Sequence, residues 1–301
     1  MDHISSFIEN GIIEFGPIID KKKCAELYED VLKTRDWSEN LFRSQEEVEK
    51  DPKFDKANPG LGVFNLAEKY DLSFIEDNEI VKDHLERILG LDYEILLKKF
   101  ICGVPPNWVP KWLMPEATRK VGANMGRWIK PEYRDITYFR GLEYHQDLID
   151  HPGQTGEYVT FYVYLDDVDI GMSALNVVAK SHMYGATMFP HCLENEDKEA
   201  CTIDYGPDEN HMTTLNTKVL PAERGYAFLW SSITLHGTRP QTSDKARISL
   251  RYTFKKNDNN KKNELINDLL NSSEGPLTTE EGRDDINLET FEQVKFDKVL
   301  R

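Results

Sequence analysis

Four segments in the second half of the chain read as β-strands, and they limit the possible folds more than any other feature. EYVTFYVYLDDVD, SALNVVAKSH, GYAFLWSSITLHGT and ARISLRYTF are rich in β-branched and aromatic residues, with turn residues between them. This pattern predicts a mainly β fold, an antiparallel sandwich or barrel, with its core over about residues 136–255.

The N-terminal part, residues 1–135, is expected to pack as helices against that core. A short strand over 12–15 leads into a helix with Asp20 as its N-cap, and a second helix over 78–90 ends at Gly90. Residues 105–135 are rich in Pro and Trp, which is typical of a loop. This loop is either a lid beside a pocket or packed surface.

Two polar segments interrupt or follow the β-rich part. The insertion at 191–217 lies between strands, and its histidines, His191 and His211, are expected to be solvated. Residues 256–301 are low in aromatic side chains and read as a partly helical, loosely attached tail. We therefore expect one domain over residues 1–255, followed by the tail.

Charge and composition narrow the function classes. The net charge of −16 argues against nucleic-acid binding, which requires clustered Lys and Arg. No run of 18 apolar residues predicts a membrane span, and the first residues do not resemble a secretory signal. The four cysteines are scattered, which favours reduced thiols and a cytoplasmic protein.

A metal site is indicated by two histidine motifs. His145 and Asp147 alternate in an extended segment and so share one face, and His236 follows 91 positions later at another strand edge. Two imidazoles and one carboxylate on one face of an octahedron leave three positions open, as in non-haem Fe(II) oxygenases. The open positions accept O2 and a chelating cosubstrate.

An anchor for an anionic cosubstrate follows on the next expected strand. Arg247 lies eleven residues after His236, and Ser249 shares its face. A guanidinium binds a carboxylate with two parallel hydrogen bonds, and a hydroxyl adds a further donor. This pair therefore predicts a clamp for the distal carboxylate of 2-oxoglutarate. Arg251 also shares the face and stays open as an alternative clamp.

With these motifs the chain resembles phytanoyl-CoA dioxygenase-type Fe(II)/2-oxoglutarate oxygenases over about residues 7–255. The resemblance rests on H-Q-D, a strand ending in L-D-D, S-x-L-x-V-V-x-x-S-H-x-x-G, and the later L-H-G, T-S-D and Arg. It implies a double-stranded β-helix (jelly-roll or cupin-like) core and iron at His145, Asp147 and His236. It also implies 2-oxoglutarate at Arg247 and Ser249, converted with O2 to succinate and CO2.

The resemblance has departures and consequences of its own. Ala179-Lys180 replaces the family's usual Pro-Gly, so Lys180 is expected near the mouth of the pocket. Thr137 and Tyr138 are candidates for the second cosubstrate contact. Halogenating relatives carry a small residue at the position of Asp147, so its carboxylate favours hydroxylation-type chemistry.

Further candidates each have two readings. His151 is either a substrate contact or a turn residue before Pro-Gly, and Trp230 either faces the pocket or belongs to the core. Arg239 either meets an anionic substrate or is solvated. Ser181 and His182 are expected to serve capping and turn structure.

The resulting hypothesis is a dioxygenase that oxidises an unactivated C–H bond of a small metabolite. One alternative is an acyl-thioester substrate, bound to CoA or a carrier, which would require a basic rim at the mouth. Another is a non-enzymatic jelly roll that binds a metal or a small ligand. The sequence identifies neither the substrate nor the outcome among hydroxylation, desaturation, cyclisation and epoxidation, and it predicts no oligomeric state.

Overall fold

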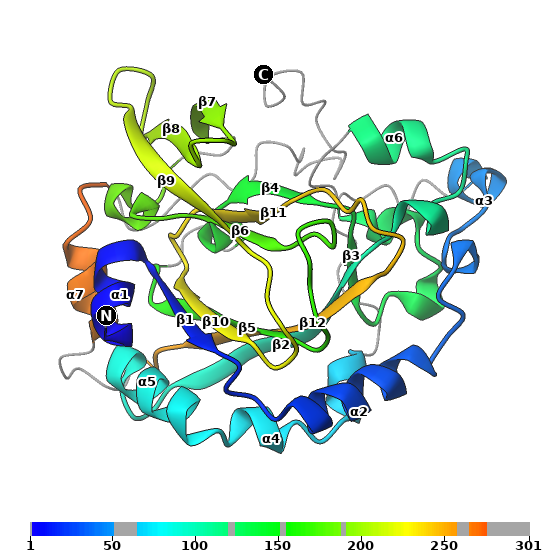
Figure 1. Cartoon of the computed structure of the whole chain (residues 1–301), viewed down its shortest axis with the longest axis horizontal. Helices are drawn as coiled ribbons and strands as arrows, with labels where there is room; N and C mark the ends of the chain where they lie inside the picture. The colour runs from blue at the N-terminus through cyan, green and yellow to red at the C-terminus, as the bar shows by residue number, and fades with distance from the viewer. Residues whose placement is uncertain are drawn as a thin grey trace.

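Two six-stranded sheets face each other in the computed structural model, which describes residues 2–50, 65–119, 124–150, 155–187, 191–257 and 265–275 (Figure 1). The first sheet has the order β1 (Ile12–Gly16), β10 (Ala227–Ser231), β5 (Tyr158–Tyr164), β12 (Arg247–Lys255), β2 (Glu94–Gly103) and β3 (Thr137–Phe139). The second has the order β4 (Leu142–His145), β11 (His236–Thr238), β6 (Leu175–Val178), β9 (Thr213–Leu220), β8 (Thr202–Gly206) and β7 (Cys192–Asp197). The predicted mainly β fold is confirmed.

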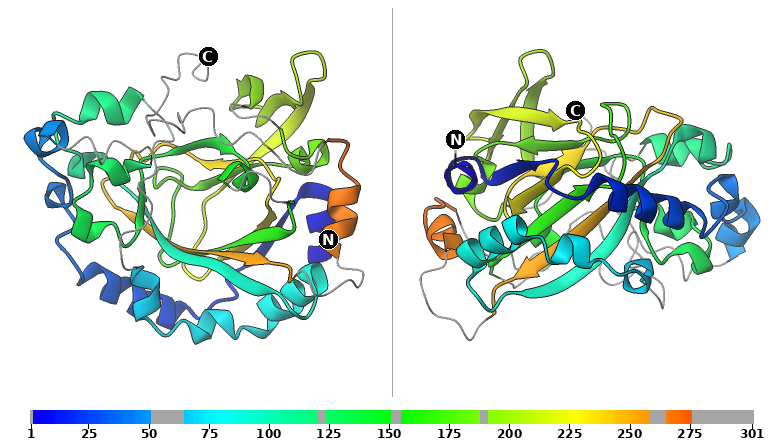
Figure 2. Two further views of the ribbon diagram at one scale, coloured as in Figure 1. Left: turned by 180° about the vertical axis from the view of Figure 1, so that it is seen from behind. Right: turned by 60° about the horizontal axis from the view of Figure 1, so that its bottom comes forward.

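Helices cover the outer face of the first sheet, as Figures 1 and 2 show. They are α2 (Lys21–Leu32), α4 (Ser73–Glu76) and α5 (Glu79–Leu89), whereas α1 (His3–Asn10) lies beside the edge strand β1. The Asp20 carboxylate caps α2 by accepting from the backbone N–H groups of Lys22 and Lys23, as predicted. Asn78 caps α5 in the same way, and the helix ends at Gly90, whose φ of +90° favours glycine.

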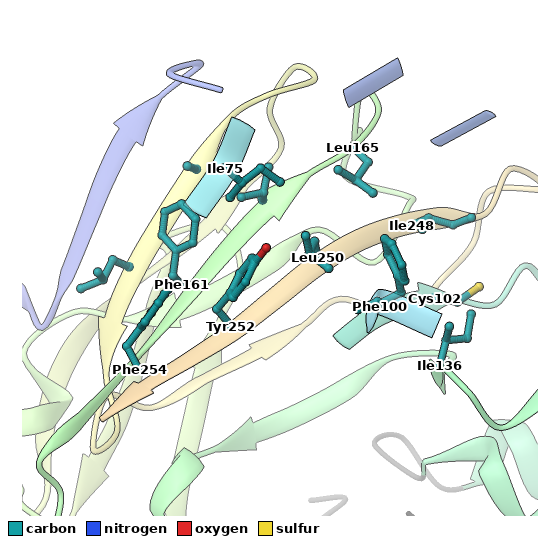
Figure 3. Packing of buried hydrophobic residues seen from close by; sticks show 14 of the residues in the cluster. Ile75, Phe100, Cys102, Ile136, Phe161, Leu165, Ile248, Leu250, Tyr252 and Phe254 are labelled. Carbon is teal, nitrogen blue, oxygen red and sulfur yellow. The ribbon is translucent and has the colours of Figure 1, made fainter. Parts of the chain in front are cut away.

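Strand β12 separates two environments because its residues alternate between the faces of the sheet. The side chains of Ile248, Leu250, Tyr252 and Phe254 point to one side and join the hydrophobic core beneath the helices (Figure 3). Arg247, Ser249 and Arg251 occupy the alternate positions and face the second sheet. A smaller apolar cluster between the sheets includes Tyr162, Leu175 and Trp230.

The N-terminal part and the polar insertion both contribute strands. Strand β1 matches the strand predicted over 12–15, and both β1 and β2, which come from the first 135 residues, are part of the first sheet. The polar insertion forms β7, β8 and most of β9, which extend the second sheet as antiparallel neighbours. Their outward residues are charged or polar, which is why this stretch lacks the apolar texture of the core strands.

Short helices fill the remaining connections. They are η1 (Glu39–Leu41), α3 (Gln45–Lys50), η3 (Leu66–Lys69), η4 (Pro106–Trp108), α6 (Met114–Arg119), η5 (Met125–Trp128), η6 (Pro131–Tyr133), η7 (Asp147–Asp150) and η8 (Ser181–Tyr184). In the predicted tail, α7 (Leu265–Asn271) packs against α5 and buries Ile266, Leu269 and Leu270. His151 and residues 276–301 lie outside the described residues.

Two expectations from the sequence concern membrane-spanning helices and the state of the cysteines. Within the described ranges, no helix is both long and apolar enough to cross a bilayer. All four cysteines lie in described segments as free thiols, with Cys24 and Cys102 buried.

Candidate active site

His145 and His236 are brought together as a cross-strand pair. Strands β4 and β11 run antiparallel with these two residues directly opposite each other, and their ring centroids are 4.3 Å apart. Gly237 allows the close approach of the strands, because a Cβ there would lie 2.5 Å from the carbonyl oxygen of Leu142. The glycine of the L-H-G motif therefore has a steric purpose beside the histidine.

Backbone carbonyls orient both imidazoles. The Nδ1 of His145 lies 2.9 Å from the carbonyl oxygen of Glu143, and the Nδ1 of His236 lies 2.9 Å from that of Thr234. A proton on Nδ1 that donates to a carbonyl leaves Nε2 as the ligand atom. Burial lowers the pKa of His236 to about 3, so its imidazole is neutral near pH 7 and suited to a metal.

Asp147 is held from both sides of its carboxylate. Its Oδ2 accepts hydrogen bonds from Thr160 Oγ1 at 2.6 Å and from Trp230 Nε1 at 3.0 Å. Thr160 and Trp230 face each other across the β5–β10 pair, so one register places both donors. Its Oδ1 lies 3.6 Å from His236 Nε2 and accepts from Arg251. The carboxylate is thus fixed with Oδ1 toward the histidines.

The electrostatics of Asp147 keep it ionised. Burial alone would raise the pKa of this carboxyl, but Arg251, His236 and His145 outweigh burial and hold the pKa below its usual range. Candidate ligand atoms of the two histidines and Asp147 all lie within 4.8 Å of one another. Two neutral nitrogens and one hard oxygen on one side fit Fe(II), with open positions facing the pocket.

Of the predicted cosubstrate clamp, Arg247 lines the pocket beside the candidate ligands, whereas Ser249 is buried and is not among the described lining residues. Arg247 is almost fully buried, donates to the carbonyl oxygen of Ser173, and has its guanidinium 5.7 Å from the centroid of the Tyr162 ring. Within the described part of the chain, Arg247 Nε and Ser249 Oγ meet no hydrogen-bond acceptor or donor. Buried polar atoms in this state fit the carboxylate of a bound molecule.

A pocket is lined by two of the three candidate metal ligands, His145 and His236. Its described lining consists of Lys99, Ile101, Asn124, Phe139, Leu142, His145, Tyr162, Leu175, Trp230, His236, Gly237, Thr238, Arg247 and Arg251. The sequence interpretation missed the polar members Lys99, Asn124 and Thr238. Thr238 had a usable signal, because it lies two residues after His236 and so shares its face.

Other candidate residues lie elsewhere. The Tyr138 hydroxyl receives a hydrogen bond from Arg35, and its ring belongs to the core beneath the helices, across the sheet from the pocket. Thr137 is buried at the start of β3 and is not among the described lining residues. Lys180 pairs with Glu9 at 3.3 Å, away from the lining.

The remaining histidines and Arg239 differ in their surroundings. Arg239 pairs with Glu196 at 2.9 Å and is not part of the described lining. His182 hydrogen-bonds to the carbonyl oxygen of Ile8, in keeping with the turn role predicted for it.

The prediction that His191 is solvated is wrong. Its ring is buried, with Nδ1 2.7 Å from Thr187 Oγ1. Burial, then the nearby His145 and His236, lower its pKa to about 3. Because β7 begins directly after His191, this residue lies at the inner end of the polar hairpin, near the candidate ligands His145 and His236. His211 is exposed and pairs with Asp208, as a solvated residue does.

Over residues 9–249 the sequence matches the family described as Phytanoyl-CoA dioxygenase (PhyH). No individual curated relative matches the chain.

Several solved structures share the fold at low sequence identity. The epimerase SnoN, in complex with Fe3+, alpha ketoglutarate and nogalamycin RO, is 12% identical with a TM-score of 0.52, over 84% of this chain and 82% of that one. EvdO2 from Micromonospora carbonacea var. aurantiaca, complexed with 2-oxoglutarate, is 14% identical with a TM-score of 0.51, over 85% and 90%. The carbocyclase SnoK from nogalamycin biosynthesis is 14% identical with a TM-score of 0.50, over 85% and 83%.

Proposed function

The chain belongs to the phytanoyl-CoA dioxygenase family and is a non-haem Fe(II)/2-oxoglutarate-dependent oxygenase, and from this premise we propose which residues perform the reaction and on what kind of substrate. His145, Asp147 and His236 hold Fe(II). Arg247 and Ser249 bind the distal carboxylate of 2-oxoglutarate. The oxidised bond is a C–H bond of a free small molecule.

The observation that carries this proposal is the convergence of the three ligand atoms within 4.8 Å. The outer atom of each ligand is already engaged, Nδ1 by a carbonyl and Oδ2 by Thr160 and Trp230. Each ligand therefore directs one atom toward the metal position in a fixed orientation, and in Asp147 this atom is Oδ1, which also accepts from Arg251. A polar cluster without such outer support would not hold its geometry.

The protein's own contribution is binding, orientation and exclusion of water. Bound Fe(II) supplies O2 activation coupled to the oxidative decarboxylation of 2-oxoglutarate to succinate and CO2. Arg247 and Ser249 set the position of the cosubstrate, so that its 2-oxo acid end reaches the open metal positions. Tyr162, Leu175 and Trp230 make the pocket wall apolar and limit the access of water.

A free small molecule is favoured over an acyl thioester by the surroundings of two cations. A CoA or carrier-bound substrate would require a basic rim, and the two cations in the sequence that suggested one, Lys180 and Arg239, pair with Glu9 and Glu196. The carboxylate at position 147 occupies the metal position that a halide would need, which favours hydroxylation-type chemistry. The similar structures include an epimerase and a carbocyclase, so the reaction product has to be identified by experiment.

The decisive experiment measures succinate release and iron content together. Wild-type protein is loaded anaerobically with Fe(II), mixed with 2-oxoglutarate and ascorbate, and then exposed to O2. We expect His145→Ala to reduce both iron retention and succinate release by more than about 100-fold, since even residues behind the ligands cost 10- to 100-fold.

His211→Ala is the matched control, because His211 is exposed and pairs with Asp208 outside the pocket. It should retain wild-type values. Wild-type protein that neither binds Fe(II) nor releases succinate would refute the assignment of these residues.

A further inference from the structure

The pocket is positively charged although the protein as a whole is strongly negative. Its described lining includes Lys99, Arg247 and Arg251, and no described lining residue is acidic. The chain has a net charge of −16, so this local excess of cations runs against the overall composition. A cationic cavity in an acidic protein indicates that an anion is bound there.

The proposed function assigns no role to two of the lining cations, Lys99 and Arg251, and the one in contact with a proposed metal ligand is Arg251. It lies on the inner face of β12, opposite Lys99 on β2 and Tyr162 on β5. Its side chain is 17% exposed, and Asp147 is its partner in an ion pair through Oδ1. Among the described residues, its Nε meets no hydrogen-bond acceptor.

Metal binding would add positive charge beside the ion pair between Arg251 and Asp147. The oxygen of Asp147 that Arg251 contacts is the one directed at His236 Nε2, hence the one that would ligate Fe(II). A dication there places a second positive centre beside the guanidinium. One carboxylate then faces both charges, and a largely buried cation needs a further anion.

The cosubstrate does not supply that anion. In the proposed function, the 2-oxo acid end of 2-oxoglutarate binds the metal, and its distal carboxylate binds Arg247 and Ser249. Beside the metal, Asp147 and the two carboxylates of 2-oxoglutarate carry three negative charges, whereas Fe(II), Arg247 and Arg251 carry four positive charges, and the further lining cation Lys99 is not included in this count. The missing charge has to arrive with the substrate.

We propose that the substrate is a small organic acid and that Arg251 binds its carboxylate beside the metal. This inference rests on the proposed function. The apolar wall of Ile101, Phe139 and Leu142 would receive the hydrocarbon part of such a molecule. Because Arg251 contacts a proposed metal ligand, the oxidised carbon lies close to the acid group along the substrate.

The experiment compares carboxylic acids with their primary amides. A panel of aliphatic and aromatic acids, each paired with its amide, is added to anaerobic wild-type protein holding Fe(II) and 2-oxoglutarate. Binding is followed by tryptophan fluorescence and by the melting temperature, and succinate release is measured after O2 is admitted. We expect the best acid to bind at least about tenfold more tightly than its amide, as a charge-assisted hydrogen bond predicts.

Variants at position 251 separate the substrate from the cosubstrate. Arg251→Gln should abolish the preference for acids, leaving the KM for 2-oxoglutarate within about threefold, whereas Arg251→Lys should retain part of the preference. Lys218→Gln is the control, since it removes a cation paired with Glu14 on the surface. It should change nothing.

Three results would overturn the inference. Amides could bind wild-type protein as well as their acids do, or no acid in the panel could bind at millimolar concentration. Alternatively, Arg251→Gln could weaken the binding of 2-oxoglutarate as strongly as Arg247→Gln does, which would show that Arg251 binds the cosubstrate. The acid-to-amide comparison uses wild-type protein, so it stands even if Arg251→Gln does not fold. A failure of the proposed function is seen separately, as absent iron binding and absent succinate before any acid is added.

Discussion

The two faces of strand β12 are both buried, yet they differ completely in chemistry. Ile248, Leu250, Tyr252 and Phe254 point toward the helices and pack in a continuous apolar core. Arg247, Ser249 and Arg251 alternate with them on the inner face, and each has one polar atom that meets no described partner. Arg247 and Arg251 line the pocket. The backbone hydrogen bonds to β2 and β5 are common to both faces.

This difference separates stability from binding within a single strand. The outer face lowers the free energy of the folded state by removing apolar surface from water. The inner face buries charge and unmatched polar atoms, which costs free energy until a ligand supplies the partners. Substitutions on the two faces should therefore have opposite signatures, and the following experiments test that separation.

The largest effect is expected on the outer face. Leu250→Ala should lower the free energy of unfolding by about 2–5 kcal/mol, because it leaves a cavity in the core beneath the helices. Denaturant melts would measure this loss. The KM for 2-oxoglutarate of the remaining folded protein should be unchanged, and Leu250→Met, which conserves volume, should cost under about 1.5 kcal/mol. A large rise in KM would break the separation.

Arg247→Gln should show the reverse signature. Losing a charge-assisted interaction worth about 1.5–3 kcal/mol should raise the KM for 2-oxoglutarate roughly 10- to 100-fold. The unfolding midpoint should stay close to that of wild type. Arg247→Lys should restore only part of the affinity, because an ammonium cannot form two parallel hydrogen bonds to one carboxylate. An unchanged KM for 2-oxoglutarate would show that a residue other than Arg247 binds the distal carboxylate.

Trp230→Phe probes the support behind the metal ligand. It removes the donor to Asp147 Oδ2 and keeps most of the ring in place. Loss of such an outer partner should weaken Fe(II) binding by about tenfold or more. Metal titration of the purified protein would measure it. Trp37→Phe is a comparable substitution far from the ligands, where Nε1 donates to the Leu32 carbonyl oxygen, and it should leave the metal affinity unaltered.

Ser249→Ala is expected to have the smallest effect. Removing one neutral donor to the cosubstrate should raise its KM about fivefold, since a single hydrogen bond contributes about 1 kcal/mol. Because Ser249 Oγ meets no described partner, the unfolding free energy should stay the same or rise slightly. Clear destabilisation would show that this hydroxyl serves the fold.

The fold and the grouping of the main site residues could be predicted because they depend on short-range periodicity. Alternation along β12 places Arg247, Ser249 and Arg251 on one face. His145 ends β4 and Asp147 begins η7, so the expected extended segment is wrong for Asp147, but the short spacing still brings the two residues together. The L-H-G motif marks the strand that pairs with β4. These residues are close together in the sequence within each group, so their spacing is enough to predict the grouping.

The supporting contacts could not be predicted because they depend on register between distant strands. Thr160 and Trp230 meet at Asp147 only through the β5–β10 pairing. The sequence allowed Trp230 a place either in the pocket or in the core. Its side chain is buried and donates a hydrogen bond to Asp147. The burial of His191 could not be predicted, because the polar residues that follow it form the exposed end of the hairpin. His191 itself lies at the buried end.

The arrangement around Asp147 also has a mechanical consequence. The proposed histidine ligands belong to the second sheet, whereas the donors that hold the aspartate, Thr160 and Trp230, belong to the first. A metal bound by all three would act as a cross-link between the two layers of the sandwich. Metal at 1,000 times its Kd would stabilise the folded state by about 4 kcal/mol. Through this cross-link, the gain should appear as slower hydrogen exchange in both sheets at once.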